Sequence, residues 1–148
     1  MQILSNLFEI KLSKATIATI GTFDGIHIGH QKILNSLARF AKENSLKSIV
    51  ITFDPHPRKI INKKNSIELI NTIEEKKEKL KTLGIDYLIV QKFDEKFSET
   101  EANKFVEILK NNINIEKLIV GYDHRFGKNR NADINDLKKY GKELNFEV

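Results

Sequence analysis

The chain has 148 residues, 40% hydrophobic and 30% charged, which is typical of a single globular domain with a sizeable core. It contains no cysteine and no apolar run near the roughly 20 residues that a spanning helix requires, which excludes disulfides, cysteine-based zinc sites and a membrane span. The N-terminus lacks the basic and apolar regions of a signal peptide, so we expect a cytoplasmic protein.

Short β-branched runs alternate with helical patterns at intervals of roughly 30 residues, which predicts an α/β fold: a Rossmann-like parallel sheet with helices on both faces. We expect strands at residues 15–20, 48–53, 87–91, 118–120 and 146–148, and helices at residues 27–44, 73–83, 99–109 and 134–144. Capping boxes at Thr72/Glu75 and Ser98/Glu101 mark two helix starts, and Gly141 weakens the last helix. Residues 60–70 are expected to form a mobile loop, and the first dozen residues show no pattern.

The net charge of +5 is spread over mixed lysines and glutamates, as along residues 74–81, which is typical of solvated helix faces. No basic stripe with interleaved aromatic residues is present. Three of the four arginines, Arg58, Arg125 and Arg130, stand beside the motifs described next. We therefore expect small phosphorylated ligands as partners, and neither nucleic acid nor a membrane.

All four histidines, both prolines and five of the seven glycines fall in three short segments, at residues 21–30, 53–57 and 121–127. Each segment directly follows a predicted strand. Because the carboxyl ends of parallel strands form the ligand crevice of an open α/β sheet, we expect all three segments to face one site.

The first segment combines a glycine turn with a helix start. Gly21 and Gly25 allow a tight turn close to a ligand, and His27 and His30 lie on one side of the first helical turn, where the helix dipole favours an anion. Gly29 removes a side chain that would crowd a nucleotide. The segment predicts a phosphate site; the alternative is an ordinary turn with two exposed histidines.

The other two segments suit the remainder of an aromatic phosphorylated ligand. Pro55 and Pro57 bracket His56 and fix an extended turn, which would form one wall of a pocket for a flat aromatic ring or, alternatively, only shape the sheet edge. In the third segment, Asp123 can accept hydrogen bonds from a ribose or adenine and Arg125 can bind a phosphate.

Gly121 and Gly127 permit unusual backbone angles in this third segment. Phe126 suits either ring stacking or the core. These two uses of Phe126 remain equally open at this point.

The three segments together resemble the FMN adenylyltransferase (FAD synthetase) domain of the bacterial bifunctional riboflavin kinase/FAD synthetases. The resemblance runs from about Thr16 to the end, through Gly-x-Phe-Asp-Gly-x-His-x-Gly-His, Phe-x-Pro-His-Pro and Gly-x-Asp-x-x-Phe-Gly in the family's order and spacing. The first block alone indicates only the wider superfamily of HIGH-type nucleotidyltransferases, and the other two narrow it to the flavin enzymes.

The resemblance implies that the FMN phosphate attacks the α-phosphorus of ATP, which brings Mg²⁺ with it, and that FAD and pyrophosphate form. It implies His27 and His30 as catalytic residues. The sequence itself shows no protein ligand for a metal. The implied ATP-binding residues are Gly21, Thr22, Phe23, Asp24, Gly25, His27, Gly29, His30, Gly121, Asp123, Arg125 and Gly127. The implied flavin-binding residues are Phe53, Pro55, His56, Pro57 and Phe126.

The sequence departs from the family's pattern in two ways. His124 stands where the family usually has phenylalanine. A Ser/Thr-rich segment ending in Ile-Arg, which by resemblance holds ATP phosphates, and the riboflavin kinase domain that follows it are both absent. We therefore expect residues 1–148 to be an FMN adenylyltransferase domain shortened at its C-terminus and weakly active alone. The alternatives are another HIGH-type nucleotidyltransferase and a non-catalytic flavin- or nucleotide-binding fragment.

Overall fold

The computed structural model describes residues 1–61 and 70–148. Five parallel strands form one sheet in the order β1-β4-β3-β2-β5, which confirms the predicted α/β fold. The strands are β1 Gln2–Ser5, β2 Thr16–Ile20, β3 Lys47–Asp54, β4 Tyr87–Lys92 and β5 Ile115–Ile119. The helices of the described ranges are α1 Ile28–Glu43, α2 Pro57–Ile61, α3 Ile73–Thr82, α4 Glu95–Ser98, α5 Ala102–Ile113 and α6 Ile134–Leu144, with a 3-10 turn η1 at Lys128–Arg130.

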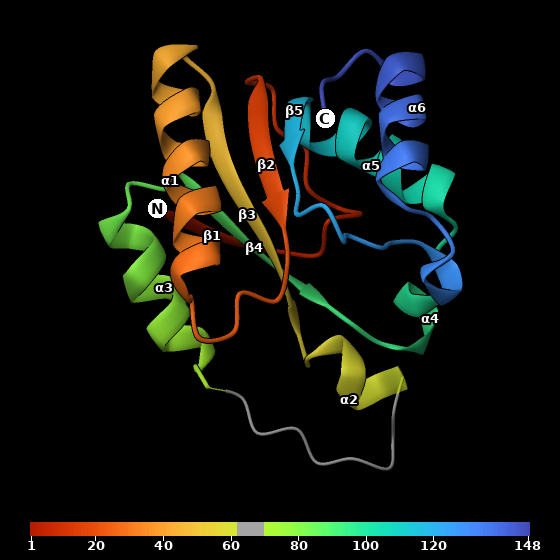
Figure 1. Cartoon of the computed structure of the whole chain (residues 1–148), viewed down its shortest axis with the longest axis horizontal. Coiled ribbons are helices and arrows are strands. Elements are labelled where there is room, and N and C mark those ends of the chain that lie inside the picture. The colour runs from red at the N-terminus through yellow and green to blue at the C-terminus, as the bar shows by residue number, and fades with distance from the viewer. Residues whose placement is uncertain (62–69) are drawn as a thin grey trace.

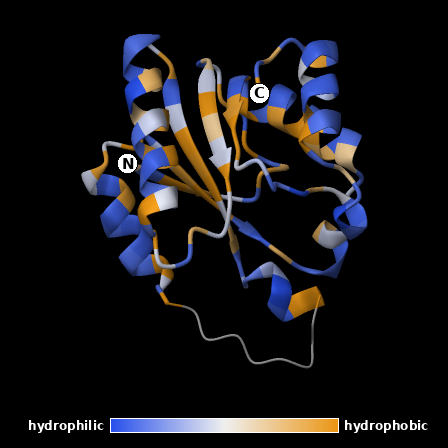
Figure 2. Cartoon of the chain, viewed as in Figure 1, coloured by the Kyte–Doolittle hydropathy of each residue, from blue (hydrophilic) through white to orange (hydrophobic). Residues whose placement is uncertain are grey.

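Helices cover both faces of the sheet: α1 and α3 lie on one side and α5 and α6 on the other (Figure 1). Successive residues of β3 enter different cores, because side chains alternate across a strand. Ile49 and Ile51 belong to the core under α5 and α6, and Val50 belongs to the core under α1 and α3. Figure 2 shows the apolar strands between helices whose outer faces are hydrophilic. This double burial explains why the strand reads as a continuous apolar run.

Several predicted elements are confirmed by their local chemistry. Thr72 and Glu75 form the predicted capping box at the start of α3. The last helix has its predicted bounds, and Gly141 within it has a packing reason. A Cβ at Gly141 would lie 2.7 Å from the carbonyl oxygen of Phe146, so only glycine lets the chain return this closely over α6.

The predicted capping box at Ser98 and Glu101 is wrong. Asp94 begins a short helix earlier, where its carboxylate accepts the Phe97 amide at 2.8 Å, and Ser98 ends that helix with its hydroxyl donating to the Glu95 carbonyl at 2.7 Å. Helix α5 begins separately at Ala102, with no side-chain cap. A local hydrogen bond at Asp94 therefore overrides the later capping pattern.

The remaining differences lie in short or exposed segments. Strand β5 starts three residues before the predicted Leu118 and ends before Val120. The predicted strand at residues 146–148 is reduced to a single bridge between Glu147 and Lys117. Strand β1 showed no pattern because it is a mostly exposed edge strand. Of the loop predicted at residues 60–70, positions 60 and 61 close α2, and positions 62–69 lie outside the described residues.

None of the helices in the described ranges has the length and apolar character needed to cross a membrane.

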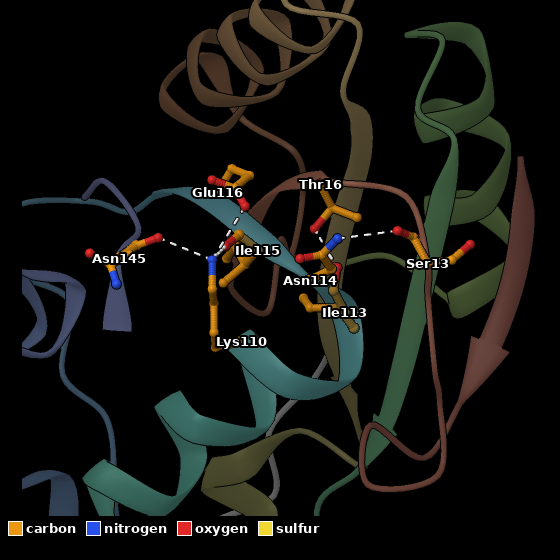
Figure 3. Close-up of polar contacts among 8 residues, drawn as sticks. All are labelled: Ser13, Thr16, Lys110, Ile113, Asn114, Ile115, Glu116 and Asn145. Carbon is orange, nitrogen blue, oxygen red and sulfur yellow. Dashed lines mark hydrogen bonds and ion pairs between the residues drawn. The ribbon is translucent and has the colours of Figure 1, made fainter. Parts of the chain in front are cut away.

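At the end of the fold that lies away from the three motif segments, one lysine forms hydrogen bonds that join three elements. The Lys110 ammonium of α5 donates to the carbonyl oxygens of Ile115 at 3.1 Å and Asn145 at 3.0 Å, and to the Glu116 carboxylate at 3.3 Å. Figure 3 shows these contacts beside Asn114, which ends α5 in a left-handed conformation. The side chain thus joins α5, β5 and the end of α6.

Replacing Lys110 by methionine should lower the free energy of unfolding by about 1–2 kcal/mol, because hydrogen bonds from a charged donor to three acceptors are lost while the aliphatic stem is kept. Urea denaturation of the variant measures this. The matched control is Lys104→Met on the same helix, which removes only an exposed ion pair to Glu107 at 3.6 Å and should change stability by less than about 0.5 kcal/mol. Equal effects of the two substitutions would contradict the structural role of Lys110.

Candidate functional site

The three motif segments follow β2, β3 and β5, which are neighbours in the order β3-β2-β5. The chain passes from β2 to β3 on one side and from β4 to β5 on the other, so the strand order reverses beside β2. Ligands of open α/β sheets bind at the carboxyl ends of the strands near such a reversal. In Figure 1 this edge is the lower one, with α2, α4 and the start of α1. The segments meet at one edge, as predicted.

The turn between β2 and α1 has an unusual backbone. Phe23, Gly25 and Ile26 have positive φ angles of 47°, 76° and 39°, a region that residues other than glycine rarely adopt. Phe23 and Ile26 are buried in the core between the sheet and α1. Phe23 therefore offers a ligand its backbone and not its ring.

Among the described residues, no side chain caps the start of helix α1. His27 is its N-cap residue and makes no side-chain capping bond, and the first turn has no acidic residue. The His27 and His30 rings stack with centroids 3.7 Å apart at 26°. A Cβ at Gly29 would lie 3.2 Å from the His27 ring, so this glycine makes room for the histidine pair. An anion at this helix start would meet unpaired amides and two imidazoles.

His30 is the more enclosed of the two histidines. Its Nδ1 atom is buried and has no hydrogen-bond partner within the described residues. Burial lowers the pKa of His30, with His27 and Lys76 adding to the effect and Asp24 opposing it. The ring is therefore neutral near pH 7, and a bound phosphate would favour its protonation.

Asp24 has a structural contact that the sequence did not indicate. Its carboxylate accepts the amides of Ile70 at 2.9 Å and Asn71 at 3.1 Å, which ties the turn to the start of α3. Burial acts to raise the pKa of Asp24, but the two amides and then Lys76 lower it overall. The carboxylate is thus already bonded within the protein, and its predicted contact with ATP stays a prediction.

The second segment is a turn that leads into a helix. The Asp54–Pro55 peptide bond is cis. Pro57 begins α2, so the segment is less extended than predicted. Proline suits the first helical position because the amide there needs no partner. His56 Nδ1 accepts the Arg58 amide at 3.2 Å. Burial, and after it Arg58, lowers the pKa of His56.

The third segment packs its glycine and aromatic residues against α5. A Cβ at Gly127 would lie 2.8 Å from that of Ala102, and the φ of Gly127 is +76°, so glycine is required there for packing. Phe126 is 7% exposed and belongs to the core, although its edge borders the cavity described next. His124 stacks on Phe126 with centroids 6.0 Å apart at 17°. Burial, and secondly Arg130, lowers the pKa of His124, while Asp123 opposes this.

A cavity of about 820 Å³ lies between the three segments. We call the aromatic residues of its lining the floor and the arginines and histidines of its lining the rim; two carboxylates, Asp24 and Glu99, also line it. The floor residues are Phe53, Phe93, Phe97, Phe105 and Phe126, and the rim residues are Arg58, Arg125, Arg130, His56 and His124. Such a site suits a flat aromatic molecule that carries negative charge. A second cavity of about 550 Å³, beside Phe40 and Phe146, lies away from all three segments.

The cavity includes about half of the predicted site residues. Those lining it are Gly21, Thr22, Asp24, Phe53, His56, Pro57, Arg125, Phe126 and Gly127. Those outside its lining are Phe23, Gly25, His27, Gly29, His30, Pro55, Gly121 and Asp123. The turn that contains Gly21, Thr22 and Asp24 lines the cavity and leads along the chain to His27, so the cavity and the histidine pair lie at the same edge of the sheet.

Sequence reasoning missed part of the cavity floor. Phe93 and Phe97 stand four residues apart around α4, and their rings lie 5.5 Å apart. Phe97 also packs on Phe53, 5.7 Å away, which comes from the strand end of the second segment. The four-residue spacing after a strand was the available signal, since it places one phenylalanine just before a short helix and the other within its first turn, where the two rings can pack.

Comparison with known proteins gives a consistent assignment. A family model for FAD synthetase matches residues 9–148. Over its whole length the chain is 37% identical to a bifunctional riboflavin kinase/FMN adenylyltransferase of Buchnera aphidicola subsp. Schizaphis graminum, of which it covers 48%. Over 93% of its length it is 35% identical to a protein of Listeria monocytogenes named FAD synthetase, of which it covers 56%. The chain spans about half the length of these curated relatives.

A solved structure, described as a macrolide-efflux protein from Streptococcus pneumoniae, matches with a TM-score of 0.80 and 26% identity, over 99% of this chain and 48% of that one. This likeness agrees with the α/β architecture. The extent of the family match, the identity of the relatives and the order of the three segments lead to one conclusion: the chain belongs to the FAD synthetase family.

Proposed function

We propose that the chain transfers the adenylyl group of ATP to FMN, forming FAD and pyrophosphate. The observation that carries the proposal is the placement of two unlike features at one sheet edge: a helix start with paired histidines, and a cavity with an aromatic floor and a cationic rim. The first suits a polyphosphate and the second an aromatic phosphate ester. The family membership supports the same reaction.

In the proposed reaction, an oxygen of the FMN phosphate attacks the α-phosphorus of ATP, and the bond from that phosphorus to the β-phosphate oxygen breaks. Pyrophosphate leaves with the bonding electron pair. The amides at the start of α1, with His27 and His30, hold the phosphates and stabilise the charge that develops. Arg58 and Arg125, on the cavity rim, orient the two anions for in-line attack.

Magnesium is proposed to enter with ATP, because Mg²⁺ commonly binds through substrate phosphates and keeps several waters. Its chemistry would be charge neutralisation on those phosphates. That residues 1–148 act as one FMN adenylyltransferase domain in the cytoplasm is part of the same proposal and rests on the sequence.

Replacing His30 by alanine should weaken ATP binding by about 1.5–3 kcal/mol, the range for hydrogen bonds to charged groups, and leave folding intact. Calorimetry measures the affinity. Lys32→Ala, which removes an exposed charge from the same helix, is the control and should have little effect. Unchanged ATP affinity in folded His30→Ala would count against the phosphate role.

The His30 contact should also depend on pH. Because the pKa of His30 is lowered in the free protein and a phosphate raises it, ATP binding should take up a proton and strengthen as the pH falls from 8 to 6. Part of this gain in ATP affinity at lower pH should be missing in His30→Ala. The titration of ATP itself is common to both proteins, so the difference between them isolates His30.

FMN should bind more tightly than riboflavin, by at least about tenfold, because the cationic rim can hold its phosphate. Quenching of flavin fluorescence during titration with protein measures both affinities. Absence of quenching by either flavin, with adenine nucleotides still bound, would favour a HIGH-type transferase acting on another phosphate. Binding of both substrates without FAD formation would instead indicate a non-catalytic binding protein.

Replacing His124 by phenylalanine should leave nucleotide and FMN affinity within about tenfold of the original. His124 is stacked on Phe126 and burial lowers its pKa, so it contributes shape and not a proton. Calorimetry and fluorescence titration of the variant test this. A larger loss would assign His124 a polar contact with the ligand.

A further inference from the structure

Lys76 is buried in a way that its sequence context does not suggest. It stands in a run of lysines and glutamates on α3, yet only 3% of its surface is exposed. Among the residues that the structure describes, it is the only buried one with an ionisable side chain. A lysine is seldom buried without a specific partner, because the ammonium group loses its hydration.

The partner of Lys76 is the turn that precedes the histidine pair. Its ammonium group donates to the carbonyl oxygen of Thr22 at 2.8 Å, and the hydroxyl of Thr52 donates to the same oxygen at 3.3 Å. Burial lowers the pKa of Lys76, and the carboxylates of Asp24 and Asp54 oppose this. The charge is therefore held by a backbone carbonyl and two nearby carboxylates.

This contact stabilises a turn that needs external support. Phe23, Gly25 and Ile26 all have positive φ, and such conformations at non-glycine residues persist only where surrounding contacts enforce them. Helix α3 and the residues just before it supply three of those contacts: the bond from Lys76 to Thr22, and the two amides before α3 that bind Asp24. The turn in turn leads directly to His27, the N-cap residue of α1.

We propose that Lys76 is a positioning residue for the adenylyl transfer proposed above, on which this inference rests: from behind the cavity wall, it fixes the Thr22 carbonyl and with it the backbone that leads to the start of α1. Lys76 is not among the residues that line the cavity, so it acts through the turn and through its charge. That charge acts on both His30 and His56 and lowers the pKa of each.

The test uses Lys76→Met, which keeps the length of the side chain and removes its charge and donor. The control is Lys79→Met, which removes the same charge from an exposed position on the same helix. With no nucleotide present, NMR titration of the histidine rings should show the midpoints of His30 and His56 moving to higher pH in Lys76→Met. His124 is an internal reference, because Arg130 and Asp123, and not Lys76, are the charges that act on it.

Other charges near the two histidines are unchanged in this comparison: Asp24 and His27 at His30, and Asp24, Arg58 and Lys59 at His56. ATP affinity should fall by roughly tenfold or more in Lys76→Met, on the scale of one lost hydrogen bond to a charged group. Lys76→Arg, which keeps a charge and donors, should recover part of that affinity, and Lys79→Met should bind ATP like the unsubstituted chain.

Unmoved midpoints of His30 and His56, or unchanged ATP affinity in folded Lys76→Met, would overturn the role of Lys76 and leave the proposed function standing. Failure of the unsubstituted chain to bind ATP would overturn both. If Lys76→Met does not fold, the unsubstituted chain with ¹⁵N-labelled lysine decides: the Lys76 ammonium signal should shift when ATP binds. A signal that does not respond to ATP would contradict the proposal.

Discussion

Strand β2 is buried at all five positions and pairs in parallel with β3 on one edge and with β5 on the other. Parallel neighbours cannot be joined by a tight turn. Strands β2, β3 and β4 therefore end at the same edge of the sheet, and helices return the chain from there to the opposite edge. The ends of β3, β2 and β5 are thereby held side by side. The histidine pair, the proline turn and the aromatic cavity all take their positions from this pairing.

Much of the architecture follows from patterns within single segments. Three elements are indicated by patterns within their own residues: α1 by its 3.6-residue period, β3 by its apolar run and α3 by its capping box. Each of these elements was predicted close to its observed bounds. Edge strand β1 could not be found this way, because an exposed strand needs no apolar face. The contact between Phe53 and Phe97 in the cavity floor was also out of reach, since β3 and α4 come together only in the folded structure.

The motif segments contain residues that the fold itself requires as well as residues expected to contact a ligand, and the sequence alone does not separate these two kinds. Gly127 is required by the nearness of Ala102, and the carboxylate of Asp24 is bonded to the backbone before α3. Both had been predicted to contact ATP. Lys76 shows the converse case: it sits in a charge pattern typical of a solvated face and becomes buried because α3 packs behind the turn. A cluster of histidines, prolines and glycines therefore predicts where a site lies more reliably than it predicts which residue contacts the ligand.

The pairing of β2 with β5 also bears on how the protein is made. Thr16 pairs with Ile115, far along the chain, whereas β2, β3, α1 and α3 already share one core. At synthesis rates of roughly 5–20 residues per second, β5 leaves the ribosome several seconds after β3. Throughout that interval, one edge of β2 has no partner, and unpaired strand edges are the usual points of association between chains. Strand β2, on which the finished site depends, is thus the part of the nascent chain most open to association with another chain.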